Sequence, residues 1–208
     1  MGDKIYVPYQ EAESEFVEKR SRFIGHVWPV DSEDQAQELI RRVKKQHYDA
    51  RHNCWCYLLG GSVVRYSDDG EPQGTAGQPM LAVFQREHVT NVLCVVTRYF
   101  GGILLGAGGL VRAYSKSAAD AVTKAGMVSY LPGTVLDIPM EYSRYGALEG
   151  FIRANAEVRN VAFAQNVVVT VAVEDTNLLK FMKEVTERSD GRCTPVTIGT
   201  GYMKKEEI

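Results

Sequence analysis

A glycine-rich turn between two apolar segments is the part of the sequence best suited to bind an anion. Backbone N–H groups at the start of a helix form an anion site, and glycine lets an oxyanion approach without a Cβ clash. Phosphate is the expected ligand, although the sequence has neither a Walker lysine nor the third glycine of a dinucleotide fingerprint. The alternative is that the glycines only allow tight packing between strand and helix. They are Gly101, Gly102, Gly106, Gly108 and Gly109.

Three cationic side chains flank this turn. Arg98 precedes it, and Arg112 and Lys116 lie four residues apart on one face of the helix that follows. Such a cluster suits a phosphodiester backbone, whose contacts neutralise charge without reading sequence. Tyr99 and Phe100 are close enough to stack a base. Considered singly, a cationic side chain on a helix usually lies on its solvated face, and an aromatic side chain is usually part of the core.

An acidic loop is the second candidate for chemistry. Clustered carboxylates can hold Mg²⁺, but the later positions of an EF-hand carry Gly74, Gln78 and Pro79. Turn formation by Asp and Gly is the favoured interpretation, with the loop shaping the rim of the phosphate cleft. We therefore expect no bound metal and no cofactor. The rim residues are Asp68, Asp69, Gly70 and Glu71.

His52, Cys54 and Cys56 alternate, so they project from one side of a strand. A zinc site needs a fourth ligand and usually wider cysteine spacing, which favours core packing. A Cys-His nucleophile stays open as an alternative, although no oxyanion hole is identifiable.

The elements that must position these residues follow a regular rhythm. Ser32 and Gln35 form a capping box that starts a helix ending near Gln46. The glycine turn connects a buried strand to a helix. The other predicted elements of this block are a strand within 16–30, a hairpin of 54–59 with 63–66, a loop over 67–79 that leads into a helix, and the buried strand 92–99.

The remainder of the chain reads as βαββαβ, which predicts a ferredoxin-like domain. Its strands are expected at 135–140, 158–163, 167–173 and 192–198, and its helices at 143–154 and 177–188. The residues Leu131-Pro132-Gly133-Thr134 indicate a turn between the two blocks. We expect α+β domains at residues 1–131 and 132–208.

Composition sets the limits on function. The chain has 208 residues, 45% apolar and 24% charged, which is typical of globular proteins. With 24 Lys and Arg against 26 Asp and Glu, the net charge of −2 excludes polyanion binding driven by bulk charge. The N-terminus does not read as a secretory signal and no apolar run reaches the ~20 residues of a membrane span. A cytoplasmic protein with reduced cysteines and no membrane partner is expected.

Two long segments together resemble the signature of the IMPACT family, in its YigZ-like bacterial branch. They run from Tyr66 to Leu81 and from Val95 to Tyr114, and Ser21–Ile24 and Arg51–Cys54 match the same pattern. The resemblance implies an N-terminal domain like domain 2 of ribosomal protein S5. It also implies a C-terminal ferredoxin-like domain similar to the last domain of an elongation factor.

The resemblance also bears on function. Longer eukaryotic relatives regulate translation during amino-acid starvation by competing for the activator of an initiation-factor kinase, mainly through an extra N-terminal domain. This sequence begins directly with the shared region, so we expect no such kinase-pathway role. The resemblance implies that the shared motif positions line one cleft: Asp68, Asp69, Gly70, Glu71, Arg98, Gly101, Gly102, Gly106, Gly109 and Arg112.

The leading hypothesis is a non-enzymatic, cytosolic protein that associates with RNA or the ribosome and acts in translation regulation. Phosphate would bind at the glycine turn and the flanking cations. The rival hypothesis is a small metal- or phosphate-dependent enzyme that uses Asp68, Asp69 and Glu71. A third hypothesis is a protein-interaction module that uses the open sheet of the ferredoxin-like half.

Overall fold

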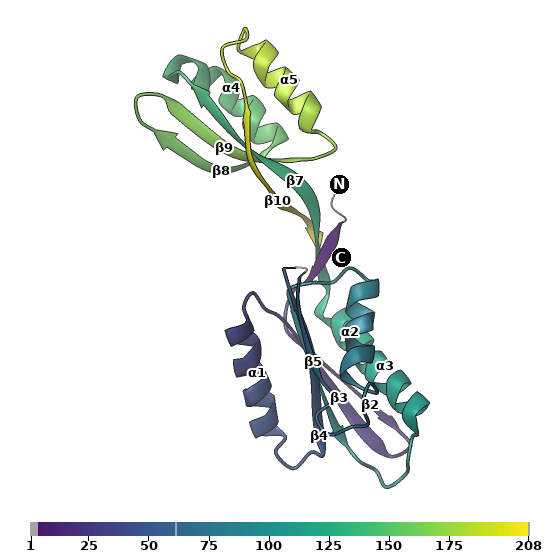
Figure 1. The fold of residues 1–208 in the computed structure, drawn as a ribbon. Coiled ribbons are helices and arrows are strands. Elements are labelled where there is room, and N and C mark those ends of the chain that lie inside the picture. Colours follow the sequence, from purple (N-terminus) through teal and green to yellow (C-terminus); the bar gives the residue numbers. More distant parts are fainter. Residues whose placement is uncertain (1–3, 61, 208) are drawn as a thin grey trace. The chain divides into compact units, whose positions relative to one another are not determined.

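The chain forms two compact units, each described by itself. The structure, a computed structural model, describes residues 4–60 and 62–207 (Figure 1). Apart from a few residues at the chain ends, the first unit comprises Ile5–Ser129 and the second Tyr130–Lys205. Both units combine helices with a sheet, which confirms the α+β class.

The first unit consists of one sheet with helices on both faces. The strands of this sheet are β2 (Ala12–Glu18), β3 (Ser21–Pro29), β4 (His52–Leu59), β5 (Val63–Ser67) and β6 (Val92–Tyr99), and the short strand β1 (Ile5–Pro8) lies outside it. Its helices are α1 (Glu33–Gln46), α2 (Gly77–Arg86) and α3 (Ala107–Ala125). The sheet order is β2-β3-β6-β4-β5, and every neighbouring pair is antiparallel.

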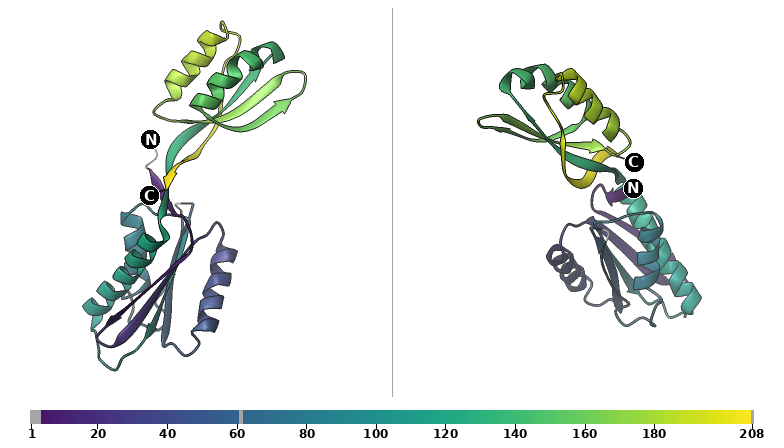
Figure 2. Two further views of the ribbon diagram at one scale, coloured as in Figure 1. Left: turned by 180° about the vertical axis from the view of Figure 1, so that it is seen from behind. Right: turned by 45° about the horizontal axis from the view of Figure 1, so that its top comes forward.

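Alternation along the strands divides the core of this unit between the two faces of the sheet. Helix α1 packs on one face, where Tyr57, Leu93 and Val95 meet its buried side chains. Helices α2 and α3 cover the opposite face, where Cys54, Cys56 and Cys94 are buried (Figures 1 and 2). Burial on both faces explains why β6 is almost continuously apolar.

Helix α1 begins where the capping box predicted. Ser32 is its N-cap, and the Ser32 Oγ accepts a hydrogen bond from the Gln35 N–H at 3.4 Å. Ala36, Ile40 and Val43 form its buried face, and the helix ends at Gln46.

The strand predicted within 16–30 is β3, which ends at Pro29, but the prediction missed that β2 precedes it in a hairpin. Glu18 pairs with Ser21 across a two-residue turn. The turn residues Lys19 and Arg20 have φ values of 46° and 65°, the left-handed backbone that tight hairpins require. Neither residue type signals such a turn, so the sequence pattern does not reveal it.

The second unit is ferredoxin-like. Its strands are β7 (Met127–Met140), which begins in the first unit, β8 (Glu157–Phe163), β9 (Val167–Glu174) and β10 (Val196–Glu207). Its helices are α4 (Tyr142–Asn155) and α5 (Leu178–Arg188). Strand β7 pairs with β9 and β10, and β9 pairs with β8, which is the order expected of βαββαβ. Apolar residues of the sheet and both helices form one core.

Two predictions for this region need correction. Residues 131–134 do not form a turn but lie inside β7. Pro132 precedes Gly133, where pairing with β9 begins, so its missing N–H costs no bond to β9. The last strand begins at Val196 rather than Arg192 and continues to Glu207.

Candidate functional site

Asp68 holds the acidic loop in place. Its carboxylate accepts hydrogen bonds from the backbone N–H groups of Gly74 (2.8 Å), Ala76 (3.0 Å) and Gly77 (2.9 Å). These groups lie at the start of α2, where backbone donors lack intrahelical acceptors. Asp68 therefore stabilises the loop and the helix start.

Asp69 connects the same loop to two other elements. Its Oδ2 accepts the backbone N–H of Asn53 at 2.7 Å, and its Oδ1 pairs with Lys44 Nζ of α1 at 2.6 Å. The carboxylate oxygens of Asp68 and Asp69 thus bind different groups of the protein. Within residues 4–60 and 62–207, no three His, Cys, Asp or Glu side chains are grouped to hold a metal ion. The carboxylates do not converge as the metal-dependent alternative requires.

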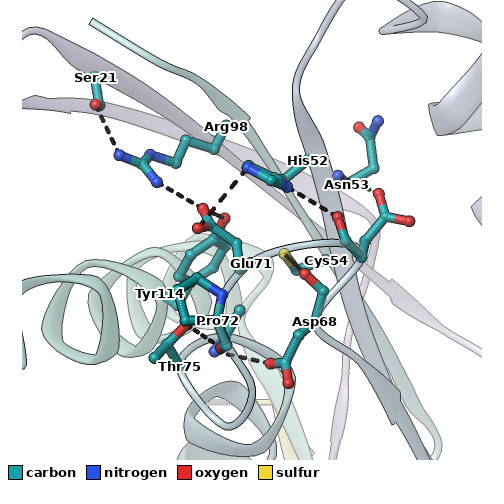
Figure 3. A network of polar contacts seen from close by, with 12 residues as sticks. Ser21, His52, Asn53, Cys54, Asp68, Glu71, Pro72, Thr75, Arg98 and Tyr114 are labelled. Carbon is teal, nitrogen blue, oxygen red and sulfur yellow. Dashed lines mark hydrogen bonds and ion pairs between the residues drawn. The ribbon is translucent and has the colours of Figure 1, made fainter. Parts of the chain in front are cut away.

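Glu71 and Arg98 form a buried ion pair (Figure 3). Glu71 Oε1 accepts from Arg98 Nη1 at 2.7 Å and from the Tyr114 hydroxyl at 2.8 Å. Only 3% of the Glu71 side chain and 6% of the Arg98 side chain are exposed. Because charges are buried only when they are paired, each of these two residues requires the other.

Ser21 ties this pair to the glycine turn. Its Oγ lies 3.3 Å from Arg98 Nη2 and 3.3 Å from the backbone N of Gly101, both of which donate to it. The Arg98 Nε is buried and has no hydrogen-bond partner in the described part of the chain.

His52 faces the other oxygen of Glu71. The His52 Nδ1 lies 2.9 Å from the Asp69 carbonyl oxygen, which can only accept, so Nδ1 carries the proton. The His52 Nε2 lies 3.8 Å from Glu71 Oε2, beyond direct hydrogen-bond distance. The two atoms point toward one another in Figure 3.

The groups beneath this pair are kept uncharged. The Cys54 Sγ donates to the Asp68 carbonyl oxygen at 3.0 Å. Burial raises the pKa of the Cys54 thiol and also raises the pKa of the Tyr114 phenol. A thiol in this state is a poor nucleophile, so the geometry gives no support to the Cys-His alternative.

A pocket of about 410 Å³ opens beside the Glu71–Arg98 pair. Its lining includes His52, Gly70 and Gly106, together with the first residue of α3, Ala107. The first helical bond of α3 runs from the Leu110 N–H to the Gly106 carbonyl at 2.9 Å, and no side chain caps the helix. The N–H groups before Leu110 therefore have no intrahelical acceptor and form the positive end of the helix dipole.

Arg51 and Phe100 also line this pocket. Arg51 is exposed, and its guanidinium carbon lies 5.9 Å from the centre of the Phe100 ring. Arg51 has no carboxylate partner among residues 4–60 and 62–207, so its charge is available to a ligand. Phe100 is 39% exposed, which leaves part of the ring accessible for stacking.

The three cations expected around one helix start are divided between two depressions, although Arg112 Nη1 stays 3.6 Å from the position that a Cβ on Gly108 would take. Arg98 lies in the interior and its charge is balanced by Glu71. Arg112 and Lys116 line a separate depression of about 260 Å³ with Phe16 and Glu18, and Lys116 pairs with Asp120. The reason is helical geometry, since the side chains at 112 and 116 share a face that does not line the Arg98 pocket.

The glycines of the turn have different roles. A Cβ on Gly101 would lie 2.0 Å from the backbone of Arg20, so this position requires glycine for packing. Gly102 and Gly106 have open surroundings and φ values of 82° and 74°, so the turn needs their backbone freedom. Gly108 and Gly109 lie in the first turn of α3, and Gly109 lines the smaller depression.

Only two of the four predicted rim residues line the pocket. Gly70 and Glu71 line the main pocket, whereas Asp68 and Asp69 are turned to the protein. Sequence reasoning did not assign Arg51 or His52 to this pocket, and it did not connect Tyr114 with Glu71. The available signal was the Arg51–Cys54 segment, which belongs to the motif pattern but whose side-chain directions depend on the fold.

Comparison with known proteins identifies the family. The model of the Impact N-terminal domain matches residues 19–122, and a domain of unknown function (DUF1949) matches residues 138–192. IMPACT family member YvyE of Bacillus subtilis (strain 168) is 39% identical over 204 residues, covering 96% of this chain and 94% of the relative. IMPACT family member YigZ of Escherichia coli (strain K12) is 33% identical over 178 residues, 83% of this chain and 87% of that protein. The chain belongs to the IMPACT family.

A solved structure supports the two-domain α+β fold. It is described as the crystal structure of an hypothetical protein, and it matches with a TM-score of 0.65 and 30% identity. The match covers 95% of this chain and 98% of that one. In the described residues, no helix has both the length and the apolar character needed to traverse a bilayer.

Proposed function

We propose that the protein associates with RNA or the ribosome, acts in translation regulation, and binds an RNA phosphate at the start of α3. The translation role is suggested by membership in the IMPACT family. The phosphate site is suggested by the geometry of the first unit. Because the whole chain carries a net charge of −2, binding must depend on this local arrangement.

The observation that carries the proposal is the uncapped start of α3 opening into a pocket beside Arg51. Gly106, Ala107 and Gly108 are exposed, so a phosphate oxygen can reach the N–H groups of this turn. Arg51 adds a charge without a carboxylate partner, and an arginine can bind phosphate with two hydrogen bonds. The exposed part of Phe100 offers a surface on which a base can stack.

Arg112 and Lys116 belong to the proposal in a smaller role. Their depression adjoins the same helix start through Gly109, so these side chains suit a neighbouring phosphate of one RNA strand. Arg98 acts from the interior, where it holds Glu71 and Ser21 in position.

The test compares two variants that each lose one exposed positive charge. Arg51→Ala removes the cation at the pocket, and Lys45→Ala removes an exposed cation on α1 that does not line it. Binding of a fluorescein-labelled single-stranded RNA is followed by anisotropy at about 50 mM and about 200 mM salt. Each lost phosphate contact reduces the salt slope of log K by about 0.7.

We expect Arg51→Ala to weaken binding and lower the salt slope, and Lys45→Ala to leave both close to the parent values. Equal effects of the two variants would show that the binding is a general charge effect. An affinity that does not fall with salt, or no RNA binding at all, would overturn the proposal.

A further inference from the structure

The loop between β6 and α3 exposes apolar side chains to water. Leu104 is 81% exposed and Ile103 is 40% exposed, although both are large hydrophobic residues. The apolar segment lies between Gly102 and Gly106, whose positive φ values let the chain turn at both of its ends. A single exposed leucine is normal on a protein surface, so exposure alone assigns no role to Leu104. Its role depends on the groups that surround it.

Two cationic depressions adjoin at this loop. Leu104 and Leu105 line the pocket that also includes Arg51, and Leu105 lines the smaller depression as well. In the part of the chain that the structure describes, neither Lys19 nor Arg112 is paired with a carboxylate. A polyanion that occupies both depressions therefore crosses the loop at Leu105. The charged residues that line the smaller depression are three cations and one acid: Lys19, Arg112, Lys116 and Glu18.

A partner that fits this surface combines negative charge with apolar faces. Phosphate groups can bind the cations, but they leave the Leu104 side chain in contact with water. Unpaired bases offer flat faces that can cover a leucine, whereas in a duplex these faces are already stacked on neighbouring base pairs. Phe100 is partly exposed in the same pocket and offers a second apolar surface to a base. Single-stranded RNA therefore matches both the charge and the apolar loop.

We infer that the protein binds RNA in its single-stranded form and that Leu104 inserts between two neighbouring bases of the strand. This inference rests on the proposed function, since it names the form of RNA that the phosphate site takes. Leucine side chains enter the base steps of DNA in architectural proteins, and a single strand opposes such insertion less because its bases are unpaired. A flat lipid surface would also cover Leu104. The cations, however, line depressions of about 410 and 260 Å³, which suit separate phosphates of one strand.

The experiment compares two leucines of nearly equal exposure. Leu104→Ala removes apolar carbons from the loop. The matched control Leu179→Ala removes the same carbons from α5, where Leu179 is 83% exposed and lines neither depression. A third variant, Leu104→Met, retains an apolar side chain of similar size. Anisotropy follows the binding of a fluorescein-labelled single strand of about ten nucleotides and of the duplex of the same sequence. Far-UV circular dichroism checks that every variant folds.

We expect Leu104→Ala to bind the single strand at least about fivefold more weakly, since the bases lose apolar contact with the side-chain carbons that alanine lacks. The salt slope of log K should keep its parent value, because a leucine neutralises no phosphate. Leu104→Met and Leu179→Ala should bind the single strand within about twofold of the parent affinity, since the first keeps the apolar volume and the second lies outside the site. Leu104→Ala should bind the duplex as the parent does.

The outcomes separate this inference from the proposed function. If Leu104→Ala keeps the parent affinity for the single strand while Arg51→Ala loses affinity, the inference is overturned and phosphate binding stands. Equal losses on the single strand and the duplex would also overturn it, because the contact would then not be with unpaired bases. Unchanged RNA affinity together with lost binding to phosphatidylglycerol vesicles would instead assign the loop to a lipid surface and overturn the inference. Absence of RNA binding by the parent protein would overturn both proposals.

Discussion

The substitution Glu71→Gln tests whether the buried ion pair stabilises the first unit. Glutamine has nearly the same shape and keeps an oxygen for the Tyr114 hydroxyl, but it removes the charge that balances Arg98. Arg98 is then a charge with a 6% exposed side chain, held by a neutral amide and by Ser21 Oγ at 3.3 Å. Breaking a buried pair in this way costs about 3–5 kcal/mol, and the retained hydrogen bond places the expectation near ~3 kcal/mol.

The assay uses the position of the two tryptophans. Trp28 and Trp55 are the only tryptophans of the sequence, and both lie in the sheet of the first unit. Urea unfolding followed by tryptophan fluorescence therefore reports on that unit. With a urea dependence of about 2 kcal/mol per molar, the midpoint should fall by about 1.5 M.

Glu87→Gln is the matched control. Glu87 also pairs with an arginine, since its Oε1 lies 2.9 Å from Arg86 Nε, but both side chains are more than half exposed. Exposed pairs contribute only about 0–1 kcal/mol, so the midpoint should move little. If Glu71→Gln shifts the midpoint no further than Glu87→Gln does, the reasoning about a buried, mutually dependent pair is refuted.

Three further predictions concern the same unit. Gly101→Ala should lower its stability by about 1–3 kcal/mol, since the new Cβ would collide with the Arg20 backbone, whereas Gly108→Ala in the same turn should not; urea midpoints distinguish them. Burial raises the pKa of the Cys54, Cys56 and Cys94 thiols, so Ellman's reagent at about pH 8 should label them only after unfolding. Rapid labelling of these thiols in the native protein would contradict their burial. Burial lowers the pKa of His26, so below about pH 6.5 the unfolded chain binds a proton that the folded chain excludes, and the free energy of unfolding should fall. The urea midpoint of the parent protein should therefore be lower at about pH 5.5 than at about pH 7.5, and His26→Gln should lose this difference.

Secondary structure with a local signal was predictable. The capping box at Ser32 and Gln35 placed α1, and the continuous apolar run of β6 indicated a strand with two covered faces. The hairpin of β2 and β3 carried no such signal, because Lys19 and Arg20 occupy left-handed positions that glycine or asparagine usually fill. The Pro-Gly pair of β7 gave the opposite error, since the pattern of a turn occurs within a strand.

The candidate site was predictable in composition and not in arrangement. The sequence singled out Arg98, the acidic loop and the glycine turn, and the structure brings Arg98, Glu71 and Gly106 to one pocket. In the structure, Arg112 and Lys116 line a second depression instead. Spacing along one helix predicts which side chains share a face, but not which face meets a strand residue such as Arg98.

The sequence alone determined the family of the chain, its α+β class, and the near neutrality that excludes polyanion binding driven by bulk charge. These properties depend on composition and on short-range patterns. Only the tertiary structure decided that Arg98 is neutralised by Glu71, that Arg51 supplies the accessible charge, and that His52 faces a carboxylate oxygen. Charge pairing and burial depend on which distant residues meet, and that is determined by the packing of helices on the sheet.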